Sequence, residues 1–152
     1  MSLFSFPAQV NERAARLVAA TVATLLSAAL LLHAWWIVPV VAIGFLLRVG
    51  WGPRLSPLAR AAMWGAARLG PPRPVAGPPK RFAQGIGAAC AITATALFAT
   101  GYAVAASAVV GMVIVFALLE ASVAFCMGCW IYGRLQRLGV VSPDVCTDCA
   151  PR

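Results

Sequence analysis

Two long stretches of apolar residues dominate the chain, and a basic region separates them. No Asp, Glu, Lys or Arg occurs from Leu17 to Leu47 or from Phe82 to Leu119. A single helical crossing of a bilayer takes roughly 20 residues, so each stretch is far longer than one crossing needs. We therefore expect each stretch to form a helical hairpin.

The hairpin turns are marked by polar and aromatic residues inside each stretch. His33, Trp35 and Trp36 interrupt the first stretch, and Thr100-Gly101-Tyr102 interrupts the second. Indole and phenol rings favour the boundary between membrane and water, which places both turns at a membrane surface. The predicted spans are residues 13–33, 36–51, 83–100 and 104–126, the last continuing toward Tyr132.

Composition agrees with a membrane protein. Of the 152 residues, 62% are hydrophobic and only 11% are charged, outside the usual range of soluble globular domains. The predicted fold is all-α and polytopic, with about four transmembrane helices in two hairpins and a short interfacial helix. It comprises a membrane domain of residues 1–135, with a basic loop at 52–81, and a cysteine-containing tail at 136–152.

The middle loop contains signals for a short helix. Ser56 and Pro57 are typical of an N-cap and a first helical position, and Gly70-Pro71 is typical of a helix end. We expect this helix to lie along the membrane surface. The proline-rich segment 71–79 is predicted to be a stiff extended spacer that leads into the third span.

The positive charges indicate the orientation. The formal net charge is +8. The lysines and arginines lie before the first span, in or beside the middle loop, or after the last span, while the hairpin turns carry none. The positive-inside rule then places the loop and both termini in the cytoplasm, as a multi-pass protein of the inner (plasma) membrane.

Because the first charges appear only at Glu12 and Arg13 and the apolar run is too long, we expect no cleaved signal peptide. The lipid bilayer accounts for the basic charge, and no nucleic-acid partner is expected.

Small residues recur at every fourth position in two predicted spans. Such stripes allow close contact between helices in lipid, so they predict either a compact bundle or a homo-oligomer. The residues are Ala19, Ala23 and Ser27 in the first span and Gly87, Ala91, Thr95 and Ala99 in the third.

Glu120 is the only carboxylate in or beside the second apolar stretch. A charge at a helix centre costs roughly 2.5 to 3.5 kcal/mol on insertion scales, so we expect it to be paired, protonated or near the inner interface. Thr93, Thr95 or an inner arginine is its expected partner, and proton transfer is its candidate role. On a straight helix Cys126 would face another direction, so joining the two requires a bend, for which Gly128 is the candidate position.

Two Cys-x-x-Cys pairs carry the candidate chemistry. Their spacing is C-x2-C-x16-C-x2-C, which falls in the range of tetrahedral zinc sites. One interpretation is therefore a four-thiolate site for zinc or iron, with the predicted ligands Cys126, Cys129, Cys146 and Cys149.

The competing interpretation is a dithiol that exchanges electrons, with Cys126 and Cys129 as the redox residues. A third leaves the thiols without a dedicated role. A permanent disulfide is not expected in the reducing cytoplasm. Cys90, alone in the third span, is most simply a small buried hydrophobe.

Several short motifs resemble a known family. They are the run Leu118-Leu119-Glu120-Ala121, the run from Phe125 to Tyr132, Ser56-Pro57-Leu58 and Pro79-Lys80-Arg81-Phe82-Ala83. Over roughly residues 8 to 137 the chain resembles the bacterial membrane-protein family called domain of unknown function 4395. The resemblance implies a multi-span inner-membrane protein without an established activity, associated with thioredoxin-like or sulfurtransferase partners, which favours thiol or sulfur handling.

Three functional hypotheses follow. The first is a membrane component with a metal-binding or redox-active cysteine site at the cytoplasmic face. The second is a non-enzymatic membrane scaffold or assembly partner, which would tolerate loss of both cysteine pairs. The third is a quinone-linked thiol oxidoreductase, although such enzymes usually face the oxidising side of the membrane, and the charges place these pairs in the cytosol.

Overall fold

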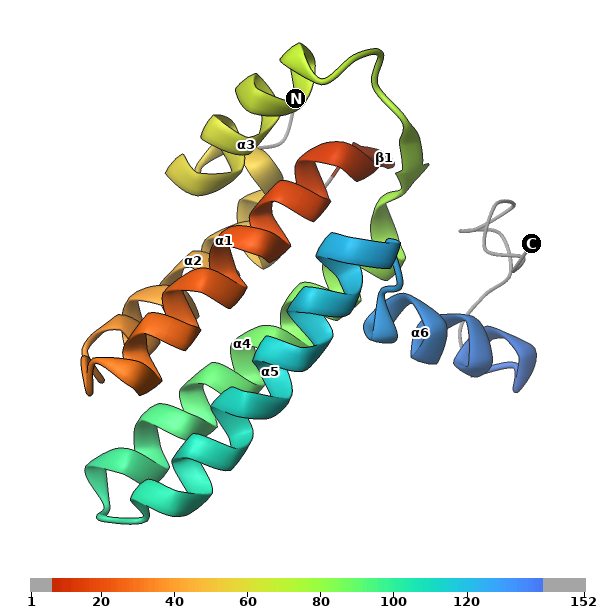
Figure 1. The fold of residues 1–152 in the computed structure, drawn as a ribbon. Helices are drawn as coiled ribbons and strands as arrows, with labels where there is room; N and C mark the ends of the chain where they lie inside the picture. The colour runs from red at the N-terminus through yellow and green to blue at the C-terminus, as the bar shows by residue number, and fades with distance from the viewer. Residues whose placement is uncertain (1–6, 141–152) are drawn as a thin grey trace.

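A computed structural model describes residues 7–140, and that part of the chain is almost wholly helical (Figure 1). The helices are α1 (Glu12–Leu31), α2 (Ile37–Trp51), α3 (Pro57–Arg68), α4 (Gly77–Ala99), α5 (Ala103–Val123) and α6 (Met127–Arg137). A 3-10 turn, η1 (Gly52–Arg54), follows α2, and the short strands β1 (Gln9–Asn11) and β2 (Pro74–Ala76) pair antiparallel. The predicted all-α class is confirmed.

The long helices form two hairpins that lie side by side. α1 packs along α5, and α2 packs along α4. Both hairpin turns lie at one end of the bundle, and α3, the strand pair and α6 lie at the other (Figure 1). We call these the turn end and the loop end. All the described lysines and arginines belong to elements of the loop end or to the helix termini that reach it.

Helices α1, α4 and α5 are each long and apolar enough to cross a membrane. Helix α2 is apolar but has only 15 residues. At 1.5 Å per residue it rises about 22 Å, less than the roughly 30 Å of a bilayer's hydrocarbon core. The chain thus has the helices of a membrane protein, and the second predicted span is a shorter helix packed along α4.

Small residues let the hairpins approach closely, as the stripes predicted. Ala19 and Ala23 on α1 and Ala91 on α4 are buried in the core. Gly87 on α4 lies directly against the ring of Phe45 on α2, where an added Cβ would come within 2.6 Å of a ring carbon. These positions serve packing inside the chain.

Helix α3 begins and ends where its signals predicted. The Ser56 hydroxyl accepts a hydrogen bond from the backbone N–H of Ala59 at 3.4 Å, and Gly70 follows the helix with a left-handed φ of 124°. Its alanine face packs on α1. The indole of Trp64 stays exposed beneath the guanidinium of Arg68, 3.5 Å from the ring centre.

The proline-rich segment differs from the predicted spacer. Its residues 74–76 form β2, which pairs with β1, and α4 begins at Gly77, six residues before the predicted start at 83. Proline lacks an N–H, but the first helical turn and the edge of a two-stranded ribbon need none. Pro78 and Pro79 therefore start the helix, and Lys80 lies in its first turn.

The fourth span also differs, because α5 does not continue toward Tyr132. It ends at Val123, Ala124 takes a left-handed φ of 59°, and α6 starts at Met127. Arg16 on α1 stabilises this end by donating to the carbonyls of Ala121 (2.9 Å) and Ser122 (2.8 Å). Those carbonyls belong to the last turn, which has no partners within its own helix.

Candidate dithiol site at the loop end

The break after α5 places the first cysteine pair at the start of a new helix. Cys126 is the N-cap residue of α6, with extended φ and ψ of −102° and 106°, and Cys129 lies in the first turn. The N-terminus of a helix carries a partial positive charge, which stabilises a thiolate there. The break is therefore the feature that gives these thiols a reactive setting.

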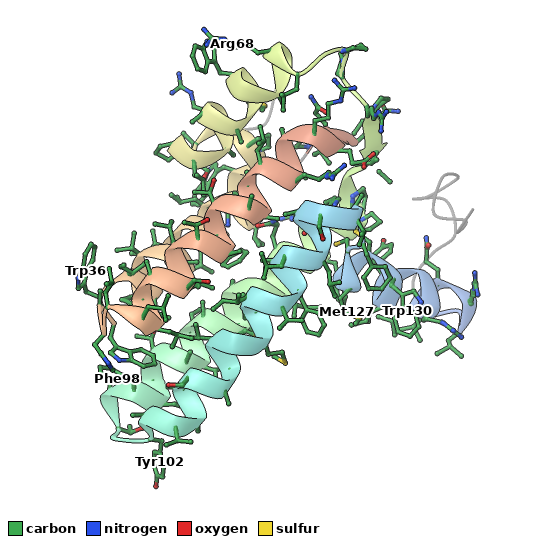
Figure 2. All side chains as sticks on the ribbon, in the orientation of Figure 1. Trp36, Arg68, Phe98, Tyr102, Met127 and Trp130 are labelled. Atoms are coloured by element: carbon green, nitrogen blue, oxygen red, sulfur yellow. The ribbon has the colours of Figure 1, made fainter. Side chains whose placement is uncertain are left out.

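A glycine holds α6 against α4. A Cβ added to Gly128 would lie 2.5 Å from the Cα of Ala83, so only glycine fits this contact. One turn further along, the ring of Tyr132 packs on Phe82 with centroids 5.7 Å apart. Figure 2 shows Met127 at the junction of α6 with the bundle and Trp130 farther along the helix. The predicted bend at Gly128 is thus wrong: the chain turns at Ala124 to Cys126, and Gly128 is a contact point.

Glu120 is paired with Lys80. The Nζ of Lys80, on α4, donates to the Oε1 of Glu120, on α5, and their side chains are only 11% and 15% exposed. The expected partners, a threonine or an inner arginine, are therefore wrong. Sequence reasoning missed Lys80 because it placed the start of α4 beyond it, whereas the early start puts its side chain inside the bundle.

Arg48 supplies a second buried cation near this pair. It is 5% exposed, and its Nε donates to the Oε1 of Gln84 at 2.7 Å. Its two terminal nitrogens have no hydrogen-bond partner among the described residues. The guanidinium lies over the ring of Phe45 at 4.7 Å and within electrostatic reach of Glu120. Two cations and one carboxylate leave a surplus of one positive charge in this buried region.

The two thiols influence each other strongly. The thiol of Cys129 hydrogen-bonds to the sulfur of Cys126 and lowers the pKa of Cys126, and the charge of Lys80 acts in the same direction. Burial and the Glu120 carboxylate oppose this shift without reversing it. The same hydrogen bond, with burial, raises the pKa of Cys129. Cys126 is therefore the thiol of the pair that ionises more readily, and its thiolate would neutralise the surplus positive charge.

A cavity of about 380 Å³ adjoins the thiols, bounded by α1, α4, α5 and α6 with one residue of α2. Cys126, Glu120 and Gln84 contribute polar groups to its wall, which is otherwise almost wholly apolar. Cys90, predicted to be a small buried hydrophobe, is half-buried in this wall. The cysteine pair thus lies at the edge of a space suited to an apolar molecule.

The second cysteine pair, Cys146 and Cys149, lies outside the described residues. Within residues 7–140, no group of three or more Cys, His, Asp and Glu side chains gathers into a metal site. The four-cysteine site for zinc or iron therefore stays a prediction. The described half of it, Cys126 and Cys129, consists of free thiols.

Fold and site together define a helical membrane protein with a Cys-x-x-Cys pair beside a buried ion pair. The family model described as a domain of unknown function, 4395, matches residues 10–137, and the chain belongs to this family. The resemblance carried by the sequence motifs is thereby confirmed. No curated protein and no solved structure matches the chain.

Proposed function

We propose that this protein is a membrane thiol-redox protein in which Cys126 and Cys129 exchange with the disulfide of a soluble partner. One observation carries the proposal. Cys126 occupies the N-cap position of α6, accepts a hydrogen bond from the Cys129 thiol and lies beside the buried Lys80–Glu120 pair. That arrangement favours a thiolate at one sulfur and keeps the second as a protonated resolving thiol.

The exchange takes two steps. The Cys126 thiolate attacks one sulfur of the partner disulfide, forming a mixed disulfide and releasing the other partner sulfur as a thiolate. Cys129 then loses its proton and attacks the Cys126 sulfur, which forms the Cys126–Cys129 disulfide and releases the second partner thiolate. Glu120, which lies near both thiols, is the group that takes up the Cys129 proton. In this direction the partner gains two electrons and the membrane protein loses two; because the exchange is reversible, a reduced partner returns two electrons to the Cys126–Cys129 disulfide by the same steps run backwards.

The partner is proposed to be a thioredoxin-like or sulfurtransferase protein in the cytoplasm. The site lies at the loop end, where the basic residues cluster, and positive charge marks the cytoplasmic side of an inner membrane. Both termini would then face the cytoplasm. A membrane-impermeant thiol reagent tests this orientation in intact cells: the Cys126–Cys129 pair should react only after the cells are opened.

The first experiment separates redox chemistry from metal binding. The full chain, purified in detergent, is equilibrated in glutathione buffers of stepped ratio, and its free thiols and bound metal are measured on the same sample. We expect the free thiols of Cys126 and Cys129 to be lost and regained together as the glutathione ratio changes. This should hold in the wild type and in a Cys146→Ser/Cys149→Ser variant alike. Stoichiometric zinc or iron that is lost in the variant would overturn the dithiol proposal in favour of a four-thiolate metal site.

A scaffold is the remaining rival. A cell in which the chain is deleted can be complemented with wild type or with a Cys126→Ser/Cys129→Ser variant, after a phenotype of the deletion has been identified. A scaffold would complement without the thiols. The redox proposal requires that the variant fail although it is inserted in the membrane at wild-type abundance.

A further inference from the structure

The cavity beside the thiols is the feature that the exchange reaction leaves unused. Cys126, whose sulfur the reaction uses, lines it, so a molecule bound there would touch the redox pair. Away from Cys126, most of the cavity wall consists of apolar residues on α1, α4 and α5, which are the helices long enough to cross a membrane. An occupant therefore has an apolar body and comes from the lipid phase.

The amide nitrogen of Gln84 is a hydrogen-bond donor in the cavity wall that a ligand could use. Arg48 has only donors, so the atom of Gln84 that bonds its Nε is the carbonyl oxygen of the amide. The Gln84 amide nitrogen has no partner among the described residues, although the side chain lines the cavity. Arg48 itself is buried, and its two terminal nitrogens have no hydrogen-bond partner within residues 7–140. The occupant that fits this end carries a hydrogen-bond acceptor such as a carbonyl oxygen.

We propose that the cavity binds the head of a lipid-soluble quinone, which oxidises the Cys126–Cys129 pair to its disulfide after a reduced partner has supplied two electrons. This inference rests on the proposed dithiol function. A quinone has an apolar body that fits the cavity wall and a carbonyl oxygen that can accept a hydrogen bond from Gln84. It can also take two electrons from a dithiol. The cavity volume of about 380 Å³ is large enough to hold the single ring of a quinone head.

The electrons and atoms balance in one net reaction. With Cys126 as thiolate and Cys129 as thiol, the pair gives up two electrons and one proton as its S–S bond forms, and the quinone takes these with one further proton from water to become a quinol. The thiolate sulfur of Cys126 attacks the quinone ring, and Cys129 displaces the ring from sulfur as the disulfide closes. One carbonyl oxygen receives the Cys129 proton by way of Glu120, which lies in the cavity wall, and the other receives the proton from water.

The test follows quinone reduction by the full chain in nanodiscs. The reduced protein is mixed with decylubiquinone, and quinone absorbance and protein thiols are recorded together without oxygen. We expect one quinone to be consumed per thiol pair lost in the wild type, and no reaction in Cys126→Ser. Gln84→Leu should slow the reaction about tenfold, the value of one lost hydrogen bond.

Two matched variants on one helix decide whether the cavity is the site. Val113 lines the cavity, whereas Val115, on the same helix, is 55% exposed and is not part of the cavity wall. Val113→Phe should abolish quinone reduction, and Val115→Phe should leave it unchanged. Each variant must retain thiol–disulfide exchange with glutathione disulfide, which shows that it is folded.

The outcomes separate this inference from the proposed function. Normal exchange with glutathione disulfide but no quinone reduction in the wild type, or equal rates in Val113→Phe and the wild type, would refute the quinone site alone. No exchange in the wild type would refute the dithiol function as well. A lipid that occupies the cavity instead would be revealed by mass spectrometry of the purified chain, would leave decylubiquinone unreduced and would also refute the site.

Discussion

The two ends of the bundle are built by the same four helices but differ in chemistry. At the turn end, the ring of Trp35 stacks on Phe98 at 4.2 Å, and short connections close both hairpins. At the loop end, the Lys80–Glu120 pair, the buried Arg48 and two free cysteines gather around a cavity (Figures 1 and 2).

The difference comes from how the chain enters each end. A short turn satisfies the helix ends locally and leaves no room for an irregular segment. At the loop end, α5 stops at a left-handed Ala124, and Arg16 from another helix satisfies its last carbonyls. The broken helix exposes a helix N-terminus to two thiols, which an unbroken span would not do. Among the described residues, the Cys-x-x-Cys pair thus lies at the end where α5 is interrupted.

Breaking the buried ion pair should have the largest effect on the loop end. Glu120→Leu leaves Lys80 as an uncompensated buried charge, and Lys80→Met leaves Glu120 without its hydrogen-bonded partner, so each costs about 3 kcal/mol of unfolding free energy. The double variant removes both charges, so we expect it to recover most of the stability lost by either single variant. Denaturation of the detergent-solubilised chain measures this cycle. Additive losses would show that the two side chains do not interact.

A methyl group at Gly128 should separate α6 from the bundle. In Gly128→Ala the new Cβ meets the backbone of Ala83, and overpacking of this kind costs about 1 to 3 kcal/mol. We expect slower thiol exchange and a lower melting temperature. Gly133→Ala, on the same helix with no atom near the added methyl, provides the control and should be neutral or slightly stabilising. Equal behaviour of the two variants would contradict the close packing of α6.

The pH dependence of Cys126 alkylation should shift in a set order. Reactivity rises as the pH passes the pKa of Cys126, because only the thiolate reacts. Cys129→Ala removes the hydrogen bond that contributes most to lowering this pKa, so its profile should move to higher pH the farthest. Lys80→Met should move it in the same direction by less, and Glu120→Gln should move it to lower pH. A Lys80→Met profile that moves to lower pH would refute the electrostatic account.

The turn end should respond in the opposite way, with a small loss of stability and no change in chemistry. Trp35→Ala removes a stacked ring pair, which is worth about 0.5 to 1.5 kcal/mol beyond its buried area. Trp36→Ala, at a ring that is 69% exposed, is the matched control. Thermal unfolding should report the loss in the first variant only, while the rate of thiol exchange stays at the wild-type value in both.

Much of the fold was predictable because its signals are long or local. The uncharged stretches predicted the hairpins, and Ser56-Pro57 predicted the start of α3. The break after α5 was not predictable, because no glycine or proline marks Ala124 and its support comes from Arg16, far away in sequence. Once the break was missed, Glu120 and Cys126 seemed to face apart.

The site was predicted only in part for the same reason. The Cys-x-x-Cys spacing identified Cys126 and Cys129, and Glu120 stood out as a carboxylate beside an apolar stretch. Lys80 was hidden by the proline-rich segment that precedes it, which resembles a spacer although its last prolines begin α4. A buried pair depends on where two helices meet, and local sequence carries no signal for that.

The most direct test of the dithiol is to trap its nucleophile. Cys126→Ser and Cys129→Ser variants of the full chain, with Cys90→Ser as the control, are incubated with glutathione disulfide and analysed by mass spectrometry. We predict that Cys129→Ser accumulates a stable mixed disulfide at Cys126 and that Cys126→Ser forms almost none at Cys129. Equal trapping at both cysteines, or trapping only at Cys129, would contradict the account of Cys126 as the activated thiol at the start of α6.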